Sequence, residues 1–263
     1  MRPIPLAFLM LAACGSAATA PKWPSSPCHQ LLFEATRFTV CDPGQGKLKL
    51  VAASKSEAPL RTFAEVATLL SAERVAFAMN AGMFDEDGRP IGLAVVEGAQ
   101  VHAINLRGGG GNFHLMPNGV FLVRKSGAAS IVTSDAFKMA PDIALATQSG
   151  PMLVIDGKLH PKFDPDGESR FIRNGVGITS DGNALFVISN EVVSFGKLAR
   201  FFRDGLHARN ALYFDGSVSS LWDPASGRQD AGVPLGPMIV AMKHAPSSRS
   251  VASAPDRARR ARP

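Results

Sequence analysis

The chain has 263 residues, of which 46% are hydrophobic, 19% charged and 7% aromatic, which is the composition of an ordinary soluble globular protein. This excludes a collagen-like or low-complexity chain, and the length permits a hydrophobic core without structural metals. The formal charge of +6 comes mainly from Arg2 and from five arginines in residues 246–263. Since little positive charge is left for the rest of the chain, we expect no nucleic-acid partner.

The N-terminal residues 1–13 predict an export signal, because one basic residue precedes a short apolar run. The run ends in Leu11-Ala12-Ala13-Cys14-Gly15, which resembles the lipobox of bacterial lipoproteins. Cys14 would then be the lipid-bearing first residue of a mature protein anchored in the bacterial cell envelope, facing the periplasm or the exterior. The alternative is a plain secretory peptide cut near Ala18 or Ala20, with Cys14 discarded.

Two further cysteines, Cys28 and Cys41, flank a segment that predicts two short strands around a polar turn. In an exported chain such a pair favours a disulfide that ties neighbouring strands. A metal pair is the weaker interpretation, because no set of Cys or His residues completes a tetrahedral site nearby. The six histidines are scattered without ligand spacing, so we expect neither a catalytic metal nor another cofactor.

Composition divides the chain into a signal peptide (1–13), a tether (14–27), one domain (28–243) and a disordered basic tail (244–263). Short strand-like runs separated by Gly, Asp and Asn turns dominate the domain. They are Lys47–Ala52, Ile91–Glu97, Val120–Arg124, Met152–Ile155, Gly175–Thr179 and Ala184–Val193. The pattern predicts an α+β domain with mixed but largely antiparallel sheets and a few flanking helices.

Two helices are predicted. The first begins with the capping box of Thr62 and Glu65, and its apolar face comprises Phe63, Val66, Leu69 and Leu70. The second has Ser194 as a candidate N-cap and Gly205 as its end, and its apolar face comprises Leu198, Phe201 and Phe202.

Each predicted helix leads into an apolar strand that ends abruptly in a polar residue, with glycine close behind. The strand 74–79 is followed by Asn80, and the strand 209–214 by Asp215. Almost wholly apolar strands are typical of strands buried on both faces, and their ends hold polar groups rigidly at the mouth of a crevice. We therefore expect Asn80 and Asp215 to face one site, the alternative being that both are ordinary turn residues.

The order of several short segments resembles the phosphodiester glycosidase family over about residues 28–243. The segments that carry the resemblance are Asn80-Ala81-Gly82-Met83-Phe84, Gln148-Ser149-Gly150-Pro151, Arg173-Asn174-Gly175-Val176-Gly177 and Leu212-Tyr213-Phe214-Asp215-Gly216-Ser217. A bacterial branch of the family is more similar still, and shares Gly111-Asn112-Phe113-His114 and Pro117-Asn118-Gly119-Val120-Phe121. Another branch has a run of glycines after its Asp, where this chain has Val218-Ser219-Ser220, and Thr in place of Asn174. Both departures concern sugar and aglycone specificity more than reaction type.

The resemblance implies hydrolysis of a sugar 1-phosphodiester to a free sugar and a phosphate monoester. Because a phosphate monoester has its second pKa near about 6, the leaving oxygen hardly needs a proton. One carboxylate then suffices where ordinary glycosidases use two. Asp215 is the expected nucleophile or base for water, with Glu191 as the reserve acid or base.

A guanidinium can hold two phosphate oxygens at once, so Arg173 is the candidate phosphate ligand, with Arg170 as the alternative. The opposite interpretation of Arg173 is a surface arginine in a salt bridge. Asn80 is assigned to the catalytic set as an oxyanion or hydroxyl binder. The remaining candidates for contact with a carbohydrate phosphodiester are Gly82, Gln148, Ser149, Gly150, Asn174, Gly216 and Ser217.

Ser149 is not predicted to be a nucleophile, because the Gly-x-Ser-x-Gly elbow is missing. The competing hypothesis for the whole chain is a lipoprotein that binds anionic envelope polysaccharide without cleaving it. A third is a structural partner in an envelope complex. The sequence makes no prediction of oligomeric state.

Overall fold

The computed structural model describes residues 26–54 and 56–244. The predicted signal peptide, Cys14, nearly all of the predicted tether and the predicted tail after residue 244 lie outside the described residues. Within the described part, no helix is long and apolar enough to cross a membrane.

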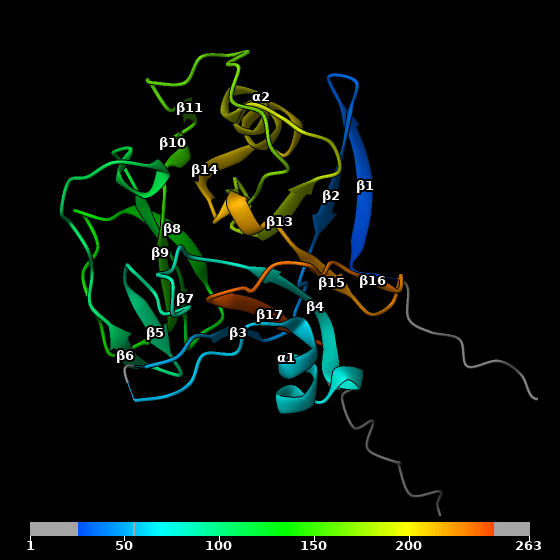
Figure 1. Cartoon of the computed structure of the whole chain (residues 1–263). Coiled ribbons are helices and arrows are strands. Elements are labelled where there is room, and N and C mark those ends of the chain that lie inside the picture. Colours follow the sequence, from blue (N-terminus) through cyan, green and yellow to red (C-terminus); the bar gives the residue numbers. More distant parts are fainter. Residues whose placement is uncertain (1–25, 55, 245–263) are drawn as a thin grey trace, which may run out of the picture.

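The described chain folds into three sheets in which all pairings are antiparallel (Figure 1). The first has the spatial order β1-β2-β13-β12-β14-β10-β11. Its strands are β1 (Cys28–Phe33), β2 (Thr36–Cys41), β10 (Met152–Ile155), β11 (Lys158–Leu159), β12 (Asn174–Thr179), β13 (Ala184–Ser189) and β14 (Ala208–Tyr213).

The second and third sheets have five strands each, in the orders β16-β15-β4-β17-β3 and β6-β5-β9-β7-β8. The second comprises β3 (Leu48–Val51), β4 (Val75–Asn80), β15 (Leu221–Asp223), β16 (Arg228–Gln229) and β17 (Met238–Met242). The third comprises β5 (Ala94–Val96), β6 (Ala99–His102), β7 (Gly119–Arg124), β8 (Ala129–Thr133) and β9 (Ile143–Ser149). The predicted fold class is confirmed.

All three sheets contribute to one central hydrophobic core. Phe186 of the first sheet lies 5.5 Å from Phe77 of the second and 5.7 Å from Phe121 of the third, measured between ring centroids. All three rings are fully buried. Edge-to-face and tilted aromatic pairs of this kind add to the stabilisation that burial itself provides.

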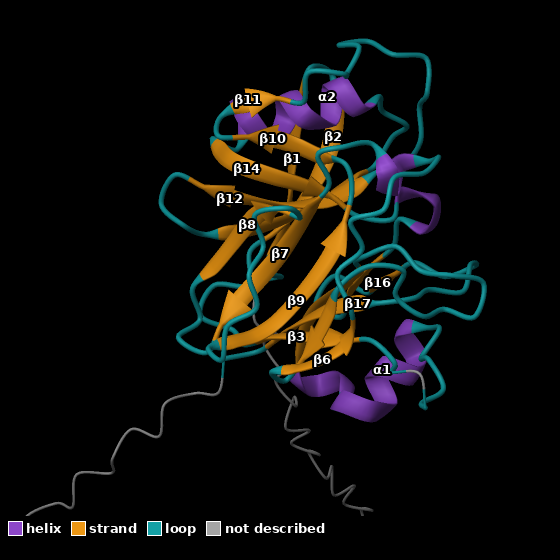
Figure 2. Ribbon diagram, turned by 90° about the vertical axis from the view of Figure 1, so that its left-hand side faces the viewer, coloured by secondary structure: helices purple, strands orange, loops and turns teal. Residues whose placement is uncertain are grey.

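Two helices cover outer faces of the sheets and lie at opposite ends of the molecule (Figure 2). Helix α1 (Phe63–Leu70) begins with the predicted capping box of Thr62 and Glu65 and buries Phe63 and Val66. The prediction for Leu69 is wrong, because its side chain is 63% exposed. In a helix of only two turns, the buried stripe is too narrow to include it.

Helix α2 (Phe195–Arg200) starts at the predicted N-cap Ser194, whose hydroxyl accepts a hydrogen bond from the Lys197 amide. It continues as a π-helical turn, Phe201–Gly205, and so ends at the predicted glycine. Short 3-10 turns occur at Ala72–Arg74, Asn112–His114 and Gly216–Val218. The strand predicted over residues 184–193 stops earlier, at Ser189, because the chain then leaves the sheet toward α2.

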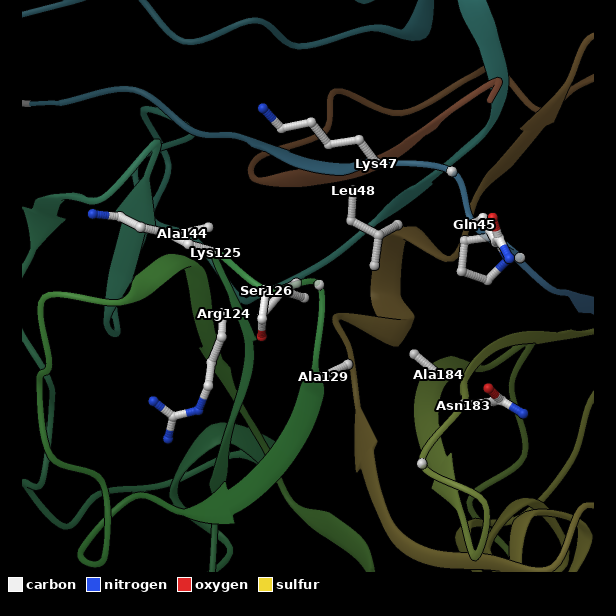
Figure 3. Close-up of a pocket in the computed structure, with 16 residues that line it drawn as sticks. Gln45, Lys47, Leu48, Arg124, Lys125, Ser126, Ala129, Ala144, Asn183 and Ala184 are labelled. Carbon is white, nitrogen blue, oxygen red and sulfur yellow. The ribbon is translucent and has the colours of Figure 1, made fainter. Parts of the chain in front are cut away.

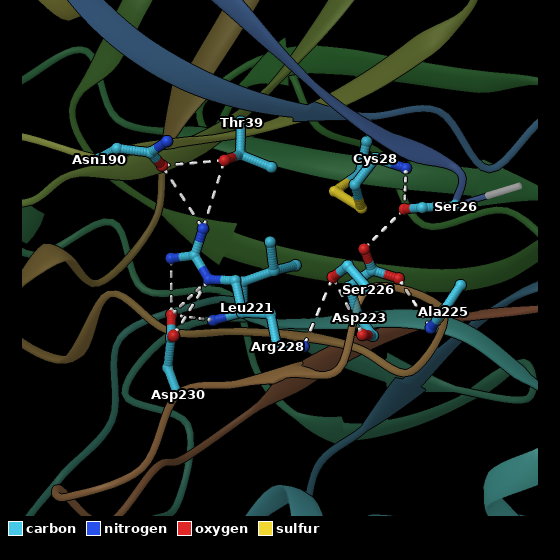
Figure 4. The surroundings of a disulfide bond; sticks show 11 residues. Ser26, Cys28, Thr39, Asn190, Leu221, Asp223, Ala225, Ser226, Arg228 and Asp230 are labelled. Carbon is cyan, nitrogen blue, oxygen red and sulfur yellow. Dashed lines mark hydrogen bonds and ion pairs between the residues drawn. A yellow bond between two sulfur atoms is a disulfide. The ribbon is translucent and has the colours of Figure 1, made fainter.

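The predicted disulfide is present between Cys28 and Cys41 (Figure 4). The two residues are directly paired in the register of β1 and β2, so the bond ties an edge strand to its neighbour. Ser26, just before β1, provides a second link, because its hydroxyl donates to the buried carboxylate of Asp223 in β15 at 2.6 Å. The disulfide and this hydrogen bond together fix the first strand to its neighbour β2 and to the second sheet.

Replacing both cysteines with serine is expected to lower the free energy of unfolding by about 2–3 kcal/mol, because the cross-link restricts the unfolded chain over a short loop. Urea unfolding monitored by circular dichroism measures the loss. Reductant should produce the same loss in the wild-type chain and no change in the double variant. A wild-type midpoint that is insensitive to reductant would contradict the assignment.

A buried histidine makes stability depend on pH. His160 donates from Nε2 to the Met116 carbonyl and accepts at Nδ1 from the Lys162 amide, with distances of 3.1 and 3.2 Å. Its ring stacks on Phe163. Burial lowers the pKa of His160 below its ordinary value of 6.5, against an opposing effect of the Met116 hydrogen bond.

The unfolded chain therefore binds more protons at this residue once the pH falls below about 6.5, and the stability of the fold decreases as the pH is lowered. We expect the urea midpoint of the wild-type chain to drop between pH 7.5 and pH 5.5. His160→Gln keeps a donor for the Met116 carbonyl and should show a smaller drop. An equal drop in both proteins would exclude His160 as the cause.

Candidate active site

The two polar residues at the strand ends lie side by side. Asn80 ends β4, a central strand of the second sheet, and Asp215 follows β14, a central strand of the first. The Asn80 side chain donates from Nδ2 to the Asp215 carbonyl at 2.7 Å, and the Asp215 amide donates to the Ala81 carbonyl at 3.0 Å. The two sheets are therefore joined at the point where the sequence places its candidate catalytic residues.

Asn80 is a buried support for this junction. Its Oδ1 accepts from the Asn174 side chain and from the Ser220 amide, both at 2.9 Å. Asn174 is itself completely buried and accepts at Oδ1 from the Ser219 hydroxyl at 3.0 Å. Because their amide groups are satisfied within the protein, these two residues hold the backbone around Asp215 in place. Contact of either with a substrate stays a prediction.

Asp215 is the part of this network that reaches solvent. It is half-buried, and its Oδ1 accepts from the amide and the hydroxyl of Ser217 at 3.2 and 2.6 Å. Among the described residues, Oδ2 has no hydrogen-bond partner. The carboxylate is thus oriented through one oxygen, while the other is available for chemistry. Ser217, an expected substrate-binding residue, is exposed beside it.

Tyr213, the only tyrosine of the chain, was not among the predicted site residues. Its buried phenol accepts a hydrogen bond from Arg173 and packs directly against Gly216. A side chain at Gly216 would overlap the phenol oxygen, which explains the glycine immediately after Asp215. Burial raises the pKa of Tyr213, although the nearby Arg173 cation acts in the opposite direction.

Arg173 lies beneath the surface and is only 1% exposed. Its guanidinium donates to the Val193 carbonyl, the Tyr213 hydroxyl and both oxygens of Ser169, over 2.9–3.1 Å. It also stacks on the Phe195 ring, with Cζ 3.7 Å from the centroid. Burial lowers the pKa of Arg173, and Tyr213 opposes this effect.

The ion pairs of the described residues do not include Arg173, so the interpretation as a surface arginine in a salt bridge is wrong. Its contact with a phosphate stays a prediction. The alternative cation, Arg170, is exposed on the same loop, where it donates weakly to the Asp166 carbonyl at 3.4 Å.

The end of β9 lies against the segment after β4. A side chain at Gly82 would collide with the Gln148 carbonyl and the Thr147 hydroxyl, so only glycine lets the two segments approach this closely. The Gln148 side chain bonds to Leu93, Ser134 and Asn105 and is satisfied within the protein.

Ser149 and Gly150 follow directly in the chain and are both fully enclosed. The Ser149 hydroxyl is buried and has no hydrogen-bond partner in the described part of the chain. An unpartnered buried hydroxyl is uncommon, and contact of Ser149 with a substrate stays a prediction. Gly150 precedes Pro151, whose carbonyl accepts from the Tyr213 amide at 3.1 Å.

Glu191 is paired through its carboxylate with a residue outside the Asp215 network. Its carboxylate forms an ion pair with Arg37 of β2 at 3.4 Å, with side chains 41% and 63% exposed. Among the described residues it forms no hydrogen bond or ion pair with Asp215, Asn80 or Asn174, so the structure does not join the reserve carboxylate to their network. Its predicted role as acid or base is untested.

A groove of about 390 Å³ begins next to Asp215. Its lining comprises the segment 216–220, here called the floor, and a second set here called the walls, namely Phe171, Ile172, Val192, Asp230, Ala231 and Val233. A larger hollow of about 510 Å³ lies near Leu48, Ser126 and Ala184 and includes none of the candidate site residues (Figure 3). Within residues 26–54 and 56–244, no group of three or more His, Cys, Asp or Glu residues has the arrangement of a metal site.

Comparison with known proteins shows where the chain belongs. The family model of phosphodiester glycosidases matches residues 73–244. The protein YigE of Escherichia coli K12, described as uncharacterized, is 41% identical over 157 residues, which are 60% of this chain and 61% of that protein. The chain therefore aligns with about three fifths of the length of this relative.

Solved structures share the fold. The catalytic domain of zebrafish N-acetylglucosamine-1-phosphodiester alpha-N-acetylglucosaminidase, auto-inhibited by its pro-peptide, superposes with a TM-score of 0.56 at 13% identity over 83% of this chain and 82% of that one. A hypothetical protein from Synechocystis gives a TM-score of 0.53 at 16% identity over 82% of this chain and 61% of that one. The family match covers the two strand ends, the arginine loop and the Asp215 turn, and on that basis the chain is a member of the phosphodiester glycosidase family.

Proposed function

We propose that the protein is an exported hydrolase that cleaves sugar 1-phosphodiesters to a free sugar and a phosphate monoester. The observation that carries the proposal is the half-exposed Asp215 carboxylate. Ser217 orients this carboxylate by a hydrogen bond, and Asn80 holds the Asp215 backbone carbonyl by another. Membership of the phosphodiester glycosidase family supports the same reaction class. The disulfide supports an oxidising compartment, and anchoring through Cys14 belongs to the proposal.

In this proposal the free Oδ2 of Asp215 either removes a proton from a water that attacks the anomeric carbon, or attacks that carbon itself to form a glycosyl ester that water then hydrolyses. The bond between the anomeric carbon and the phosphate oxygen breaks, and the electron pair leaves with the phosphate. Since that leaving group is a weak base, no second carboxylate has to supply a proton. The separation of Glu191 from the Asp215 network is consistent with such a reaction.

The phosphate requires a cation within reach. Arg170 is exposed and adjoins Phe171, a wall of the groove, so we assign it to the phosphate. The buried Arg173 acts indirectly, because it holds the Tyr213 phenol against Gly216 and so positions the turn that carries Asp215. The sequence suggested Arg173 as the phosphate ligand and Arg170 as its alternative, and the proposal takes the alternative.

The test is turnover of a chromogenic N-acetylglucosamine 1-phosphodiester by the full chain, with release of free sugar and phosphate monoester measured together. A sugar-free phosphodiester of the same chromogenic alcohol is the control and should not be cleaved. Release of sugar 1-phosphate would indicate an ordinary phosphodiesterase and contradict the proposal. Binding without turnover of any sugar phosphodiester would favour the non-catalytic lipoprotein.

A further inference from the structure

The groove beside Asp215 gathers apolar side chains that point into solvent. Phe171, Val192 and Val233 are 56%, 57% and 47% exposed, and all three line the groove. They come from three separate segments, before β12, after β13 and before β17. Scattered exposed apolar residues are ordinary, but a cluster around a hollow indicates a binding site.

Two of the three walls are fixed by the backbone. Phe171 and Val193 exchange hydrogen bonds, with the Phe171 amide donating at 3.2 Å and the Val193 amide at 2.8 Å. This bridge holds Phe171 and the adjacent Val192 at one edge of the groove. The apolar surface thus exists without a ligand, and little ordering entropy is lost when it is covered.

The serine hydroxyls of the floor are not available to donate hydrogen bonds to a ligand. The Ser217 hydroxyl donates to Asp215, the Ser219 hydroxyl to the Ile172 carbonyl or Asn174, and the Ser220 hydroxyl to the Val218 carbonyl. A hydroxyl has one hydrogen, so all three are committed inside the protein. A sugar ring, which needs both donors and acceptors around its hydroxyls, is poorly matched by such a floor.

The groove is also unsuited to an anion. Its lining contains neither lysine nor arginine. Its one acidic residue, Asp230, forms an ion pair with Arg228 at 2.8 Å and accepts from the Leu221 amide at 3.0 Å (Figure 4). Because the lining supplies no cation to balance a phosphate, the group that fits the groove is neutral and largely apolar.

We propose that this groove binds the alcohol portion of the phosphodiester and that the preferred substrates carry a hydrocarbon alcohol. The inference rests on the proposed function and adds the class of aglycone to it. The groove starts at Gly216 and Ser217, directly after the carboxylate. A substrate with its anomeric carbon at Asp215 therefore extends its alcohol along Phe171, Val192 and Val233. The volume of the groove, about 390 Å³, lies within the usual range for small-molecule sites.

The test compares the octyl and methyl esters of N-acetylglucosamine 1-phosphate at concentrations below micelle formation. We expect kcat/KM of the full chain to be about tenfold or more higher for the octyl ester, since several methylene groups leave water. Val192→Ser combined with Val233→Ser should reduce this preference by about tenfold, mainly through a higher KM for the octyl ester. Leu32→Ser is the control, because it removes an exposed apolar side chain (74%) from β1, outside the groove, and it should keep the preference unchanged.

Equal kcat/KM for the two esters, or an unchanged preference in the double variant, would overturn this inference while leaving the proposed function intact. Failure to hydrolyse either ester would instead count against the proposed function. In that case the dissociation constants of the same two esters, measured by calorimetry for the same three proteins, decide the inference. The octyl ester must then bind about tenfold or more tightly, and the double variant must lose that difference.

Discussion

Replacing Asp215 with asparagine is expected to lower kcat for sugar phosphodiester hydrolysis by about 10³-fold or more, with little change in KM. The amide oxygen of asparagine still accepts from the Ser217 amide and hydroxyl, so the turn keeps its shape. The lost carboxylate is the only group in the network assigned to attack or proton removal, and such groups contribute at least about 10²–10⁴-fold. Steady-state rates of free-sugar release from the same substrate measure the effect.

The variant needs two controls. It creates an Asn-Gly sequence with Gly216, and deamidation of that pair would restore aspartate, so Asp215→Ala is measured beside it. Asp156→Asn removes a carboxylate from an exposed pair with Arg209 and should keep full activity. If Asp215→Asn retains activity within tenfold of the wild type, Asp215 is not the catalytic carboxylate. A large loss in Glu191→Gln would then transfer the role to Glu191.

The local features of the fold follow from the sequence. The capping box at Thr62 and the N-cap at Ser194 depend on residues three positions apart, and both are present. The apolar strands before Asn80 and Asp215 are central strands of their sheets, as their composition predicts. Pairing of Cys28 with Cys41 was also predictable, because a short turn joins their strands.

The division into three sheets could not be predicted. Neighbours such as β2 and β13, or β4 and β17, are far apart in the chain, and their register depends on packing across the core. The serines that bond to the supports of Asp215 are missed for the same reason. Ser219 and Ser220 are unremarkable in a serine-rich segment, and only the folded chain brings them to Asn174 and Asn80.

Side-chain environment is a further limit on sequence analysis. An arginine followed by Asn-Gly resembles an exposed ligand for phosphate, yet the loop around Ser169 and the ring of Phe195 enclose Arg173. The lone Tyr213 at the end of an apolar strand was the available signal, since a buried phenol requires a partner. The fold brings together segments that carry the family resemblance, at the ends of β4 and β14, and the structure separates their exposed residues from their buried supports.

Arg173→Lys is expected to lower the free energy of unfolding by about 3 kcal/mol or more. Lysine has three hydrogens on one nitrogen and cannot reproduce the forked contacts with Val193, Tyr213 and Ser169. Buried acceptors that lose their donors each cost about 1–3 kcal/mol. Urea unfolding gives the loss, and Arg203→Lys, in an exposed pair with Asp204, should change stability by only about 0.5 kcal/mol or less.

Kinetics separates the two roles considered for Arg173. If it positions the Asp215 turn through Tyr213, Arg173→Lys lowers kcat with little change in KM, and Tyr213→Phe lowers kcat in the same way because the phenol oxygen that links Arg173 to Gly216 is lost. If Arg173 binds phosphate directly, its variant raises KM, and Tyr213→Phe leaves kcat near the wild-type value. Arg170→Met supplies the complementary test. A raised KM in this variant, with kcat and stability preserved, places the phosphate at the exposed arginine, because removal of a surface cation does not disturb the buried network below it.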